Sequence, residues 1–487
     1  MPITRRQFVA RSIVAAGAAA LPLAARAAEV EIAPAGVRED MGILVAAYRA
    51  MHPGLDRYLG GDRFAALAEG ATARLLREGA RLEDMYLALA RLTAAVRCGH
   101  SYPNPVNQSA VVQRALLDRR DRVPFSFRWV GERMIVVRPL TDTALVAPGE
   151  SIAAIDGVPV AELRRRLLPL GRADGSNDAK RLALMEVDGA DRFSSFDVYR
   201  PMISAARGDG TVVLERSGRR IQVPAMSEAE RSALSTTNEE DGGWRFALRD
   251  GVGLLTMPTW ALYDSAWDWQ GFLDRTFASL SEDGARGLVI DLRRNEGGMD
   301  IGLAILTRLI DAPLALPPRD RLVRYRRAPD ALRPFLDTWD PSFADWGDAA
   351  RPMTARPGFY RLERGEADSE VVQPIGPRFA GKVAVLVGPV CSSATFQFAE
   401  QVKASGCATL VGEPTGGNRR GINGGAFFFL RLPGSGLEVD LPLIGEFPRE
   451  PRPDAGVEPD VTVRQGAEDI AAGRDRALER ALALVRA

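Results

Sequence analysis

Residues 383–418, VAVLVGPVCSSATFQFAEQVKASGCATLVGEPTGGN, carry the clearest indication of how this chain folds. An apolar run predicts a buried strand, and a turn with two serines, an amphipathic helix, a second buried strand and a glycine-rich loop follow it. A serine in this turn stands where a helix begins, and there the backbone N–H groups are unpaired and carry partial positive charge. An oxyanion forming beside such a serine is stabilised, which is what a serine acyl-transfer enzyme requires.

Strand and helix patterns alternate on both sides of this stretch. Strands are predicted at 252–258 and 287–293, each followed by a helix, and a further helix begins near residue 467. This alternation predicts an α/β core over residues 231–487, with a largely parallel sheet and helices on its faces. Residues 312–378 are rich in Pro, Arg and Trp and have little periodicity, so we expect a lid-like insertion there.

Two further parts are expected ahead of this core. Residues 28–118 have helical periodicity and predict an N-terminal helical domain. Residues 119–230 have strand patterns, and APGESIAAIDGVPV at 147–160 resembles a turn and strand of the PDZ domain. The helical, polar stretch 161–205 is then an insertion in a PDZ-like domain, whose groove accepts a peptide as an added strand. The alternative is a β-domain without a ligand.

The first 27 residues have the pattern of an export signal. TRRQF at residues 4–8 is followed by a short apolar run and by Ala25-Arg26-Ala27, a small-x-small cleavage site. The paired arginines resemble a twin-arginine signal, and a Sec signal or a retained anchor is the alternative. Because the apolar run is short and alanine-rich, we expect no stable membrane span. Cleavage after Ala27 would leave a periplasmic protein.

Composition limits the partners. Lys plus Arg and Asp plus Glu both total 63, so the chain has no basic field that would attract nucleic acid. A peptide or protein substrate is the expected partner. The sequence contains no His-Glu-x-x-His and no Cys-x-x-Cys phrase, so neither a metal nor another cofactor is predicted. Nothing in the sequence indicates the oligomeric state.

A serine nucleophile needs a base, and this chain has few candidates. Lys382 opens a strand, Lys403 lies far along the helix that the serine begins, and Lys180 falls in the insertion of the PDZ-like segment. His52 stands at a helix end and is expected to be structural. His100 follows a helix within a loop, from which a side chain can project into a cleft, and it is the best available base. A structural role for His100 is the alternative.

Three phrases together resemble the tail-specific (C-terminal-processing) serine peptidase superfamily. They are LVIDLRRNEGG at 288–298, Ser393-Ala394 leading to GEPTGG at 412–417, and GVEPD at 456–460. The resemblance implies a crotonase-like (ClpP/crotonase-type) catalytic core beside the PDZ-like and helical domains.

The resemblance also implies roles for individual residues. Ser393, rather than Ser392, matches the nucleophile. The backbone N–H groups of Ala394 and of Gly297 or Gly298 would form the oxyanion hole, because adjacent glycines let main chain approach a substrate carbonyl closely.

One departure from the superfamily indicates the branch. Members of the Ser/Lys kind carry a lysine after the second glycine-rich turn, where this chain has Asn418 and then Arg419. Arginine stays protonated and cannot serve as a base. The tricorn-like branch uses a histidine ahead of the PDZ-like segment, which His100 matches, oriented by a distant carboxylate. Asp454 is our preferred orienting acid, and Glu450 is the second choice.

The cysteines suggest one more hypothesis. Their number is odd, which excludes a scaffold built on disulfides. Cys98 lies two residues before His100 and Cys391 two residues before Ser393, so the two cysteines would approach each other if the catalytic pair meets. They could then form a disulfide, and the alternative is a pair of small buried hydrophobes.

The sequence therefore predicts an exported serine peptidase that hydrolyses peptide bonds by a Ser/His/acid acyl-enzyme mechanism. A catalytically inactive peptide-binding homologue and an esterase acting on small acyl substrates are the alternatives.

Overall fold

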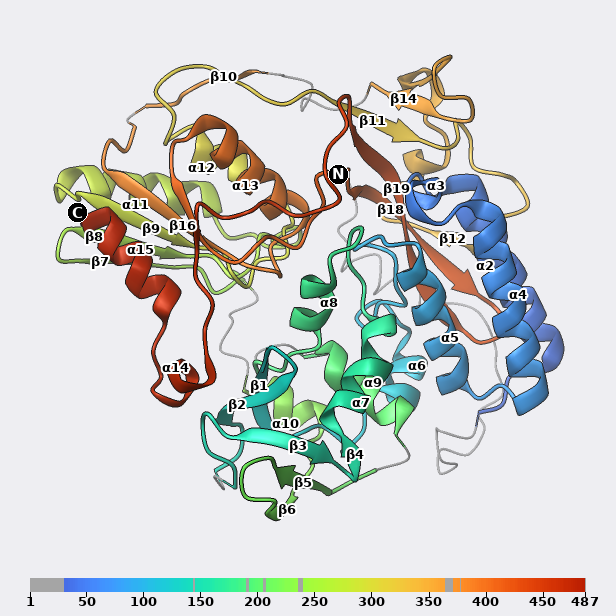
Figure 1. Cartoon of the computed structure of the whole chain (residues 1–487). Coiled ribbons are helices and arrows are strands. Elements are labelled where there is room, and N and C mark those ends of the chain that lie inside the picture. Colours follow the sequence, from blue (N-terminus) through green and yellow to red (C-terminus); the bar gives the residue numbers. More distant parts are fainter. Residues whose placement is uncertain are drawn as a thin grey trace.

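The computed structural model describes residues 30–142, 145–189, 192–204, 207–234, 240–363, 371–376 and 378–486. The predicted export signal, residues 1–27, lies outside the described residues. Over these ranges the chain forms a mixed α/β fold with three six-stranded sheets and one two-stranded sheet, β10 (Leu314–Ala315) with β15 (Val371–Val372) (Figure 1).

A mostly parallel sheet forms the α/β part of the molecule. Its strands, in spatial order, are β20 (Val461–Thr462), β17 (Thr409–Gly412), β16 (Lys382–Val387), β9 (Gly287–Asp291), β8 (Val252–Thr256) and β7 (Arg245–Arg249). Only the edge strand β7 is antiparallel to its neighbour. The predicted alternation of strand and helix is thus present in the structure.

Both faces of this sheet are covered by helices, which explains why its strands are continuous apolar runs. On one face pack α11 (Trp269–Glu282), α12 (Ile301–Leu306) and α13 (Ser393–Ser405), against side chains that include Leu288 and Val385. The other face packs against α15 (Arg476–Arg486) through side chains that include Val289 and Leu386, one residue further along each strand. The short helix α14 (Ala467–Ala471) precedes α15 (Figure 1).

The expected insertion at 312–378 is more ordered than its weak periodicity suggested. It supplies β11 (Arg319–Val323), β12 (Leu336–Asp337), β13 (Ala350–Pro352) and β14 (Tyr360–Leu362), with short 3₁₀ turns between them at Arg333–Phe335, Pro341–Ala344 and Gly347–Ala349. These strands join the long hairpin β18 (Asn423–Leu432) and β19 (Leu437–Pro448) in an antiparallel sheet ordered β12-β18-β19-β11-β14-β13. The insertion therefore widens a second sheet.

A third sheet, antiparallel throughout, lies within the segment predicted as PDZ-like. Its strands are β1 (Phe125–Val130), β2 (Arg133–Pro139), β3 (Ser151–Ile155), β4 (Val158–Pro159), β5 (Gly210–Leu214) and β6 (Arg220–Val223). The helical stretch between β4 and β5 contains α7 (Val160–Leu167), a 3₁₀ turn at Leu168–Leu170, α8 (Asp178–Leu184) and α9 (Ser195–Ile203). The helix α10 (Glu228–Ser232) follows the last strand.

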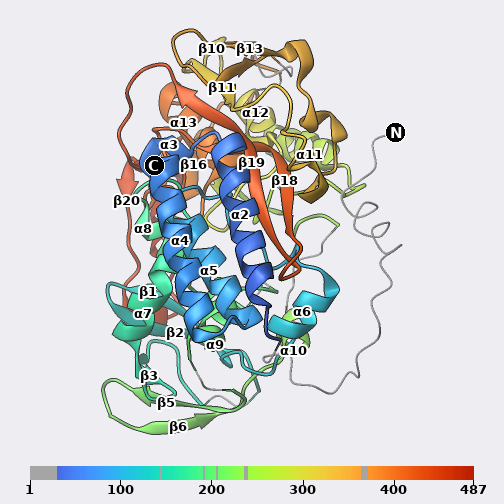
Figure 2. The same cartoon turned by 90° about the vertical axis from the view of Figure 1, so that its right-hand side faces the viewer.

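The N-terminal helices are α2 (Pro34–Met51), α3 (Leu55–Tyr58), α4 (Gly61–Glu78), α5 (Leu82–Ala95) and α6 (Ala110–Leu116). Figure 2 shows α2, α4 and α5 side by side, next to the hairpin β18–β19. One hydrophobic cluster contains side chains from these helices, from the β1–β6 sheet and from the hairpin. The loop that follows α5 and carries His100 is therefore supported by a core that these three parts of the chain form together.

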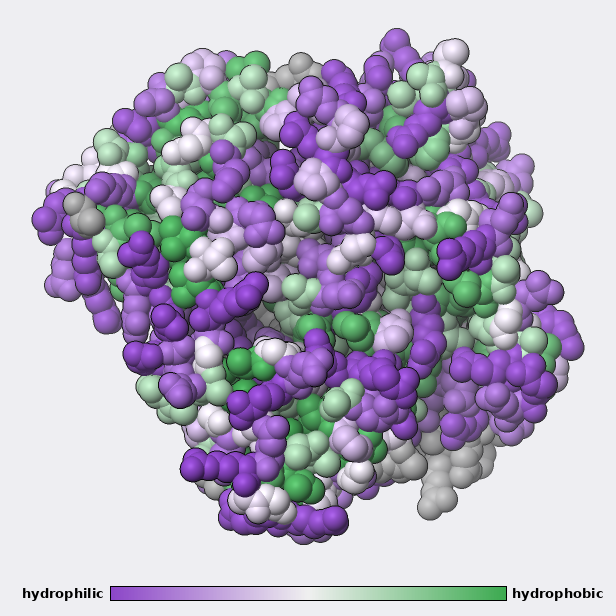
Figure 3. Space-filling view, in the orientation of Figure 1, coloured by the Kyte–Doolittle hydropathy of each residue, from purple (hydrophilic) through white to green (hydrophobic). Residues whose placement is uncertain are grey.

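On the face seen in Figure 3, hydrophilic residues dominate and hydrophobic residues occur in small scattered groups. Among the described helices, none is long and apolar enough to cross a membrane.

Candidate active site

The turn before α13 holds one serine in an unusual backbone conformation. Ser393, the first residue of α13, has a φ of 51°, in the left-handed region that L-residues with a side chain seldom adopt. Such strain costs of the order of 1–3 kcal/mol and is found mainly at functional sites. Its neighbour Ser392 has an extended backbone and is 2% exposed. Conformation thus distinguishes the predicted nucleophile from the serine beside it.

Two glycines lie against this turn. A Cβ on Gly297 would stand 2.8 Å from the Ser393 Cβ and 2.9 Å from the Ala394 nitrogen, so only glycine permits this approach. The N–H of Gly297 donates to Asn295 Oδ1 (2.8 Å). Trp260 pairs with this glycine segment through two backbone hydrogen bonds. Its N–H donates to the Gly297 carbonyl and its carbonyl accepts from the Met299 N–H, so the N–H of Gly298 is not used.

The N–H of Ala394 belongs to the first turn of α13, where no acceptor exists within the helix. Of the three predicted oxyanion donors, Gly297 therefore has its N–H bonded within the protein. The N–H groups of Ala394 and Gly298 are the two that a ligand could engage. Asn295 joins the two segments, because its Oδ1 also accepts from Thr395 Oγ1 of α13 (2.8 Å).

A cleft of about 1170 Å³ contains all the predicted site residues of the turn, the glycine loop and the base. Ser393, Ala394, Gly297, Gly298 and His100 line it together. Residues of the 312–378 insertion and of the β18–β19 hairpin, including Trp339 and Phe427, form part of its wall. Although His100 and Ser393 lie nearly 300 residues apart in the sequence, the fold brings them to one cleft.

His100 has both aromatic and charged neighbours. Its ring lies 5.9 Å from the Phe427 ring, and its Nε2 lies 3.7 Å from where a Cβ on Gly424 would stand. Burial lowers the pKa of His100 to about 4, an effect that Asp174 opposes and Lys180 reinforces. The imidazole is neutral at pH 7, as a base must be to accept a proton.

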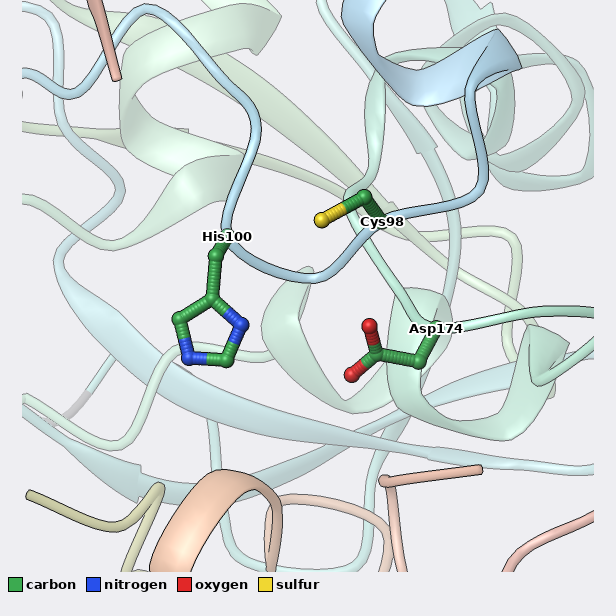
Figure 4. A group of neighbouring side chains, drawn as sticks. All are labelled: Cys98, His100 and Asp174. Atoms are coloured by element: carbon green, nitrogen blue, oxygen red, sulfur yellow. The ribbon is translucent and has the colours of Figure 1, made fainter. Parts of the chain in front are cut away.

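Asp174 is the carboxylate that lies beside His100. The two side chains and that of Cys98 have ligand atoms within 4.8 Å of one another (Figure 4). Asp174 is 1% exposed, and its Oδ1 accepts a hydrogen bond from the Gly99 N–H (2.9 Å). It comes from the loop before α8, inside the helical stretch of the PDZ-like segment.

The two acids predicted to orient His100 lie elsewhere. Asp454 accepts hydrogen bonds from Tyr58 (3.0 Å), from Ser176 and from Asn418 Nδ2 (2.7 Å). Burial raises the pKa of Asp454, but these hydrogen bonds prevail and lower it to about 2. Glu450 is exposed and lies 3.5 Å from Arg452. The acid next to His100 is therefore neither of them.

Lys180 was set aside in the sequence, yet it lies at the candidate site. Its Nζ donates to Ser392 Oγ at 2.5 Å and pairs with Glu296 at 3.2 Å, and its side chain is 1% exposed. Ser392 in turn donates to the Glu296 carbonyl (3.1 Å). Lys180 therefore connects the residue before the nucleophile to the residue before the glycine pair.

Arg172 extends this network to the loop after α5 that carries His100, which we call the histidine loop. Its guanidinium donates to the Gly99 carbonyl (2.9 Å) and to Glu296 (2.7 Å). Burial raises the pKa of Glu296, but Arg172 and Lys180 outweigh it and hold that pKa well below its ordinary value. Glu296 is therefore a carboxylate that joins Arg172, in the loop before α8, to Lys180, in the first turn of α8. These two cations contact all three segments of the site.

The glycine-rich phrase at 412–417 and the GVEPD phrase at 456–460 contact each other next to the turn at residues 391–393, which we call the nucleophile turn. The Cys391 carbonyl accepts from the amides of Gly416 (2.7 Å) and Gly417 (3.2 Å), and Thr415 Oγ1 accepts from the Val457 N–H (2.9 Å). These bonds fix the position of the turn that carries Ser393.

The hypothesis of a Cys98–Cys391 disulfide is wrong in this structure. All three cysteines are free. Cys98 Sγ accepts a hydrogen bond from Asn423 Nδ2 (3.3 Å), whereas Cys391 Sγ donates to the Leu292 carbonyl (3.0 Å). The two thiols are small buried groups in different surroundings, which was the alternative.

His52 has the structural setting that its sequence position predicted. It is fully buried, its Nδ1 accepts from the Gly54 N–H (3.1 Å), and its Nε2 lies 3.0 Å from Ser101 Oγ.

Comparison with known proteins adds to this picture. Residues 251–463 match the model of peptidase family S41. No curated protein matches the chain. Among solved structures, mature CPAF shares 15% identity over 90% of this chain and 94% of its own, with a TM-score of 0.62. Mature CPAF complexed with lactacystin shares 16% identity over 93% of this chain and 97% of its own, with a TM-score of 0.63.

At this identity the CPAF structures show a common fold, and the activity is supported by the family match. That match includes Ser393, Ala394 and both glycines, while His100, Asp174 and Lys180 lie ahead of it. The strained serine, the glycine loop beside it and the match of residues 251–463 to the S41 model together indicate a serine-type peptidase.

Proposed function

We propose that this protein is an exported peptidase that cleaves peptide bonds through an acyl-enzyme formed on Ser393, with His100 as the base. The observation that carries the proposal is that the strained Ser393, the neutral His100 and the Gly297–Gly298 loop line one cleft. The fold is a crotonase-like core, a PDZ-like β-domain and an N-terminal helical domain.

In this mechanism Ser393 Oγ attacks the substrate carbonyl while its proton passes to His100 Nε2. The amides of Ala394 and Gly298 donate to the developing oxyanion, and one such donor contributes about 3 kcal/mol. His100 then protonates the leaving amine, and water hydrolyses the ester with His100 again as base. In the reacting complex a small approach would let Asp174 Oδ2, which has no partner among the described residues, accept from the His100 Nδ1–H. This bond would keep the ring in the tautomer with Nε2 free and stabilise the imidazolium.

A fluorophosphonate probe tests the proposal, because it reacts only with an activated serine. We expect labelling of the wild type, none of Ser393→Ala, and at least 100-fold slower labelling of His100→Ala. An unlabelled wild type would favour the inactive peptide-binding homologue. A panel of peptide and ester substrates would then separate the peptidase from an esterase.

A second assignment of the nucleophile follows from the 2.5 Å bond between Lys180 and Ser392. In it, Ser392 would attack and Lys180 would accept its proton. Ser392→Ala is therefore the matched variant: it keeps labelling if Ser393 is the nucleophile and abolishes it if Ser392 is. The deep burial of Ser392, at 2% exposure, favours Ser393.

Export is proposed from the twin arginines Arg5 and Arg6. Replacing both by lysine should leave the precursor uncleaved in the cytoplasm, and cell fractionation with an antibody to the protein measures this. Periplasmic, processed protein from that variant would point to the Sec route.

A further inference from the structure

Cys98, His100 and Asp174 form a compact group of three different ligand types. Figure 4 shows the thiol, a nitrogen of the imidazole and the carboxylate facing a common point. The ligand atoms lie within 4.8 Å of one another, and no other group of three or more such residues occurs in the described ranges. Two of the three side chains, those of Cys98 and Asp174, are buried at 1% exposure.

Two polar atoms in this group have no partner among the described residues. They are Asp174 Oδ2 and His100 Nδ1, and both are buried. Leaving a buried polar atom unpaired costs about 1–3 kcal/mol. A proton shared by the two atoms removes this cost in the active peptidase, and a cation bound between them would remove it as well.

The ligand set matches Zn²⁺, which binds cysteine sulfur, histidine nitrogen and carboxylate oxygen at about 2.0–2.3 Å. Ligand atoms of a tetrahedral zinc are then about 3.3–3.8 Å apart, so an approach of about 1 Å would complete the site. Two of the ligands have supporting hydrogen bonds of the kind that orient metal ligands, from Asn423 to Cys98 and from Gly99 to Asp174. Water would take the fourth position.

We propose that Cys98, His100 and Asp174 bind a zinc ion that switches the peptidase off. The thiol of Cys98 loses its proton to solvent, and its sulfur bonds the metal together with His100 Nδ1 and one Asp174 oxygen. Zinc does no chemistry on the substrate in this state.

The inhibition follows from the single proton of a neutral imidazole, and this step rests on the proposed role of His100. In the active form the proton is on Nδ1 and Nε2 is an acceptor. Zinc occupies the Nδ1 lone pair, so the proton must be on Nε2. His100 and Ser393 line one cleft, and as a donor Nε2 can no longer take the proton of Ser393.

Equilibrium dialysis against ZnCl₂ tests the site independently of activity. We expect about one zinc per chain for the wild type and for the inactive Ser393→Ala variant. Cys98→Ser should weaken binding at least 10-fold, and Cys407→Ser, at a cysteine outside the group, should not. Cys98→Ala is a second variant, with folding of each checked by circular dichroism. Equal zinc binding by the wild type and both Cys98 variants would overturn the proposal.

Activity gives the second readout. Zinc should inhibit the wild type and Cys407→Ser, and the concentration for half inhibition should rise at least 10-fold in Cys98→Ser. Inhibition of Cys98→Ser at the wild-type concentration would place the inhibitory metal elsewhere and refute the proposal. If the wild type has no hydrolase activity, the proposed function fails, and dialysis alone still decides whether the metal site exists.

Discussion

At the scale of single residues, the most instructive side chain is Lys180. The chain has three lysines among its 63 basic residues, and this one is buried between Ser392 and Glu296. An ammonium is a compact charge with three donors, so it can reach both groups where a planar guanidinium would not fit. We interpret Lys180 as a positioning residue for the nucleophile turn and the glycine loop.

Replacing it tests this role. Lys180→Met keeps the volume and removes the charge, so Ser392 loses its donor and Glu296 retains only Arg172. We expect kcat/KM to fall at least 10-fold, mostly in kcat, because the geometry that serves the transition state is disturbed. Steady-state kinetics on a peptide substrate measures this. Lys403→Met, which removes a half-exposed pair with Asp460, is the control and should leave kcat unchanged.

Gly298 offers a second test at this scale. A Cβ there would stand 2.2 Å from the Trp260 carbonyl, and its φ of 140° is unfavourable for alanine. Gly298→Ala should displace the loop and lower kcat roughly 100-fold, about the loss of one oxyanion donor. Gly388→Ala, at a glycine with open space around it, is the matched control. Equal activity of both variants would exclude Gly298 from the oxyanion hole.

The residues that the sequence assigned to the candidate site are mostly those that stand in recognisable local patterns. Sequence phrases with recognisable spacing contain Ser393, Ala394 and the glycine pair. His100 was chosen because the chain has few other histidines or lysines that could serve as a base. Asp174 and Lys180 were missed because they lie in a polar loop and in the first turn of the short helix α8, where the only local signals are the Asn177 cap and a glycine. What places that loop on the site is packing between distant segments. The rarity of lysine in this chain was the one available signal.

At the scale of elements, Glu186 joins the segment that follows α8 to β1. Its Oε1 accepts from the Trp129 N–H of β1 (2.9 Å). Burial raises the pKa of Glu186 to about 7, with nearby Glu413 and Asp188 adding to the effect and Arg128 opposing it. The folded state therefore binds this proton more tightly than the unfolded state, where the pKa is near 4.5. The stability that this group contributes is lost as the pH rises from about 4.5 to about 7.

Glu186→Gln should remove this pH dependence, because the amide keeps an acceptor oxygen and cannot ionise. We expect the variant to unfold at a higher urea concentration than the wild type at pH 8, and at nearly the same concentration at pH 4.5. The exposed Glu458→Gln should shift the midpoint equally at both pH values. A gain that is the same at both pH values for Glu186→Gln would contradict the raised pKa.

Elements were predicted best where periodicity runs over many residues. The parallel strands and helices of the α/β part and the helices of the N-terminal part were expected from their patterns. The strands within 312–378 were not, because pieces of two to five residues carry almost no alternation of their own. β12 and β11 pair with β18 and β19, and β14 and β13 extend the same sheet beyond β11, so their strand conformation depends on long-range pairing.

At the scale of the whole molecule, the histidine loop is tied to a hairpin that follows it by more than 300 residues in the sequence. Asp440 of β19 donates its N–H to the Tyr102 carbonyl (3.0 Å), and its carboxylate accepts from Asn104 (2.9 Å) and Asn107 (2.7 Å). His100, the proposed base, is thus positioned by the sheet that contains β19, and Ser393, the proposed nucleophile, follows β16 of the mostly parallel sheet.

Asp440→Ala should weaken the contact between the histidine loop and β19. It removes the acceptor of the buried Asn104 amide, so the free energy of unfolding should fall by about 1–3 kcal/mol. We also expect lower kcat/KM and faster limited proteolysis near residues 99–107. Asp440→Asn keeps one acceptor oxygen and should have a smaller effect on all three. A loss of stability with unchanged kcat/KM would show that the loop holds its place without this contact.

The left-handed backbone at Ser393 has a cost in folding stability. Glycine has no Cβ to oppose that conformation, whereas alanine retains the serine's steric penalty, of about 1–2 kcal/mol. Two equally inert proteins, Ser393→Gly and Ser393→Ala, should therefore differ in chemical denaturation, with the glycine form the more resistant by about 1 kcal/mol. The side chain that we propose as the nucleophile thus also makes the protein easier to unfold than its glycine variant.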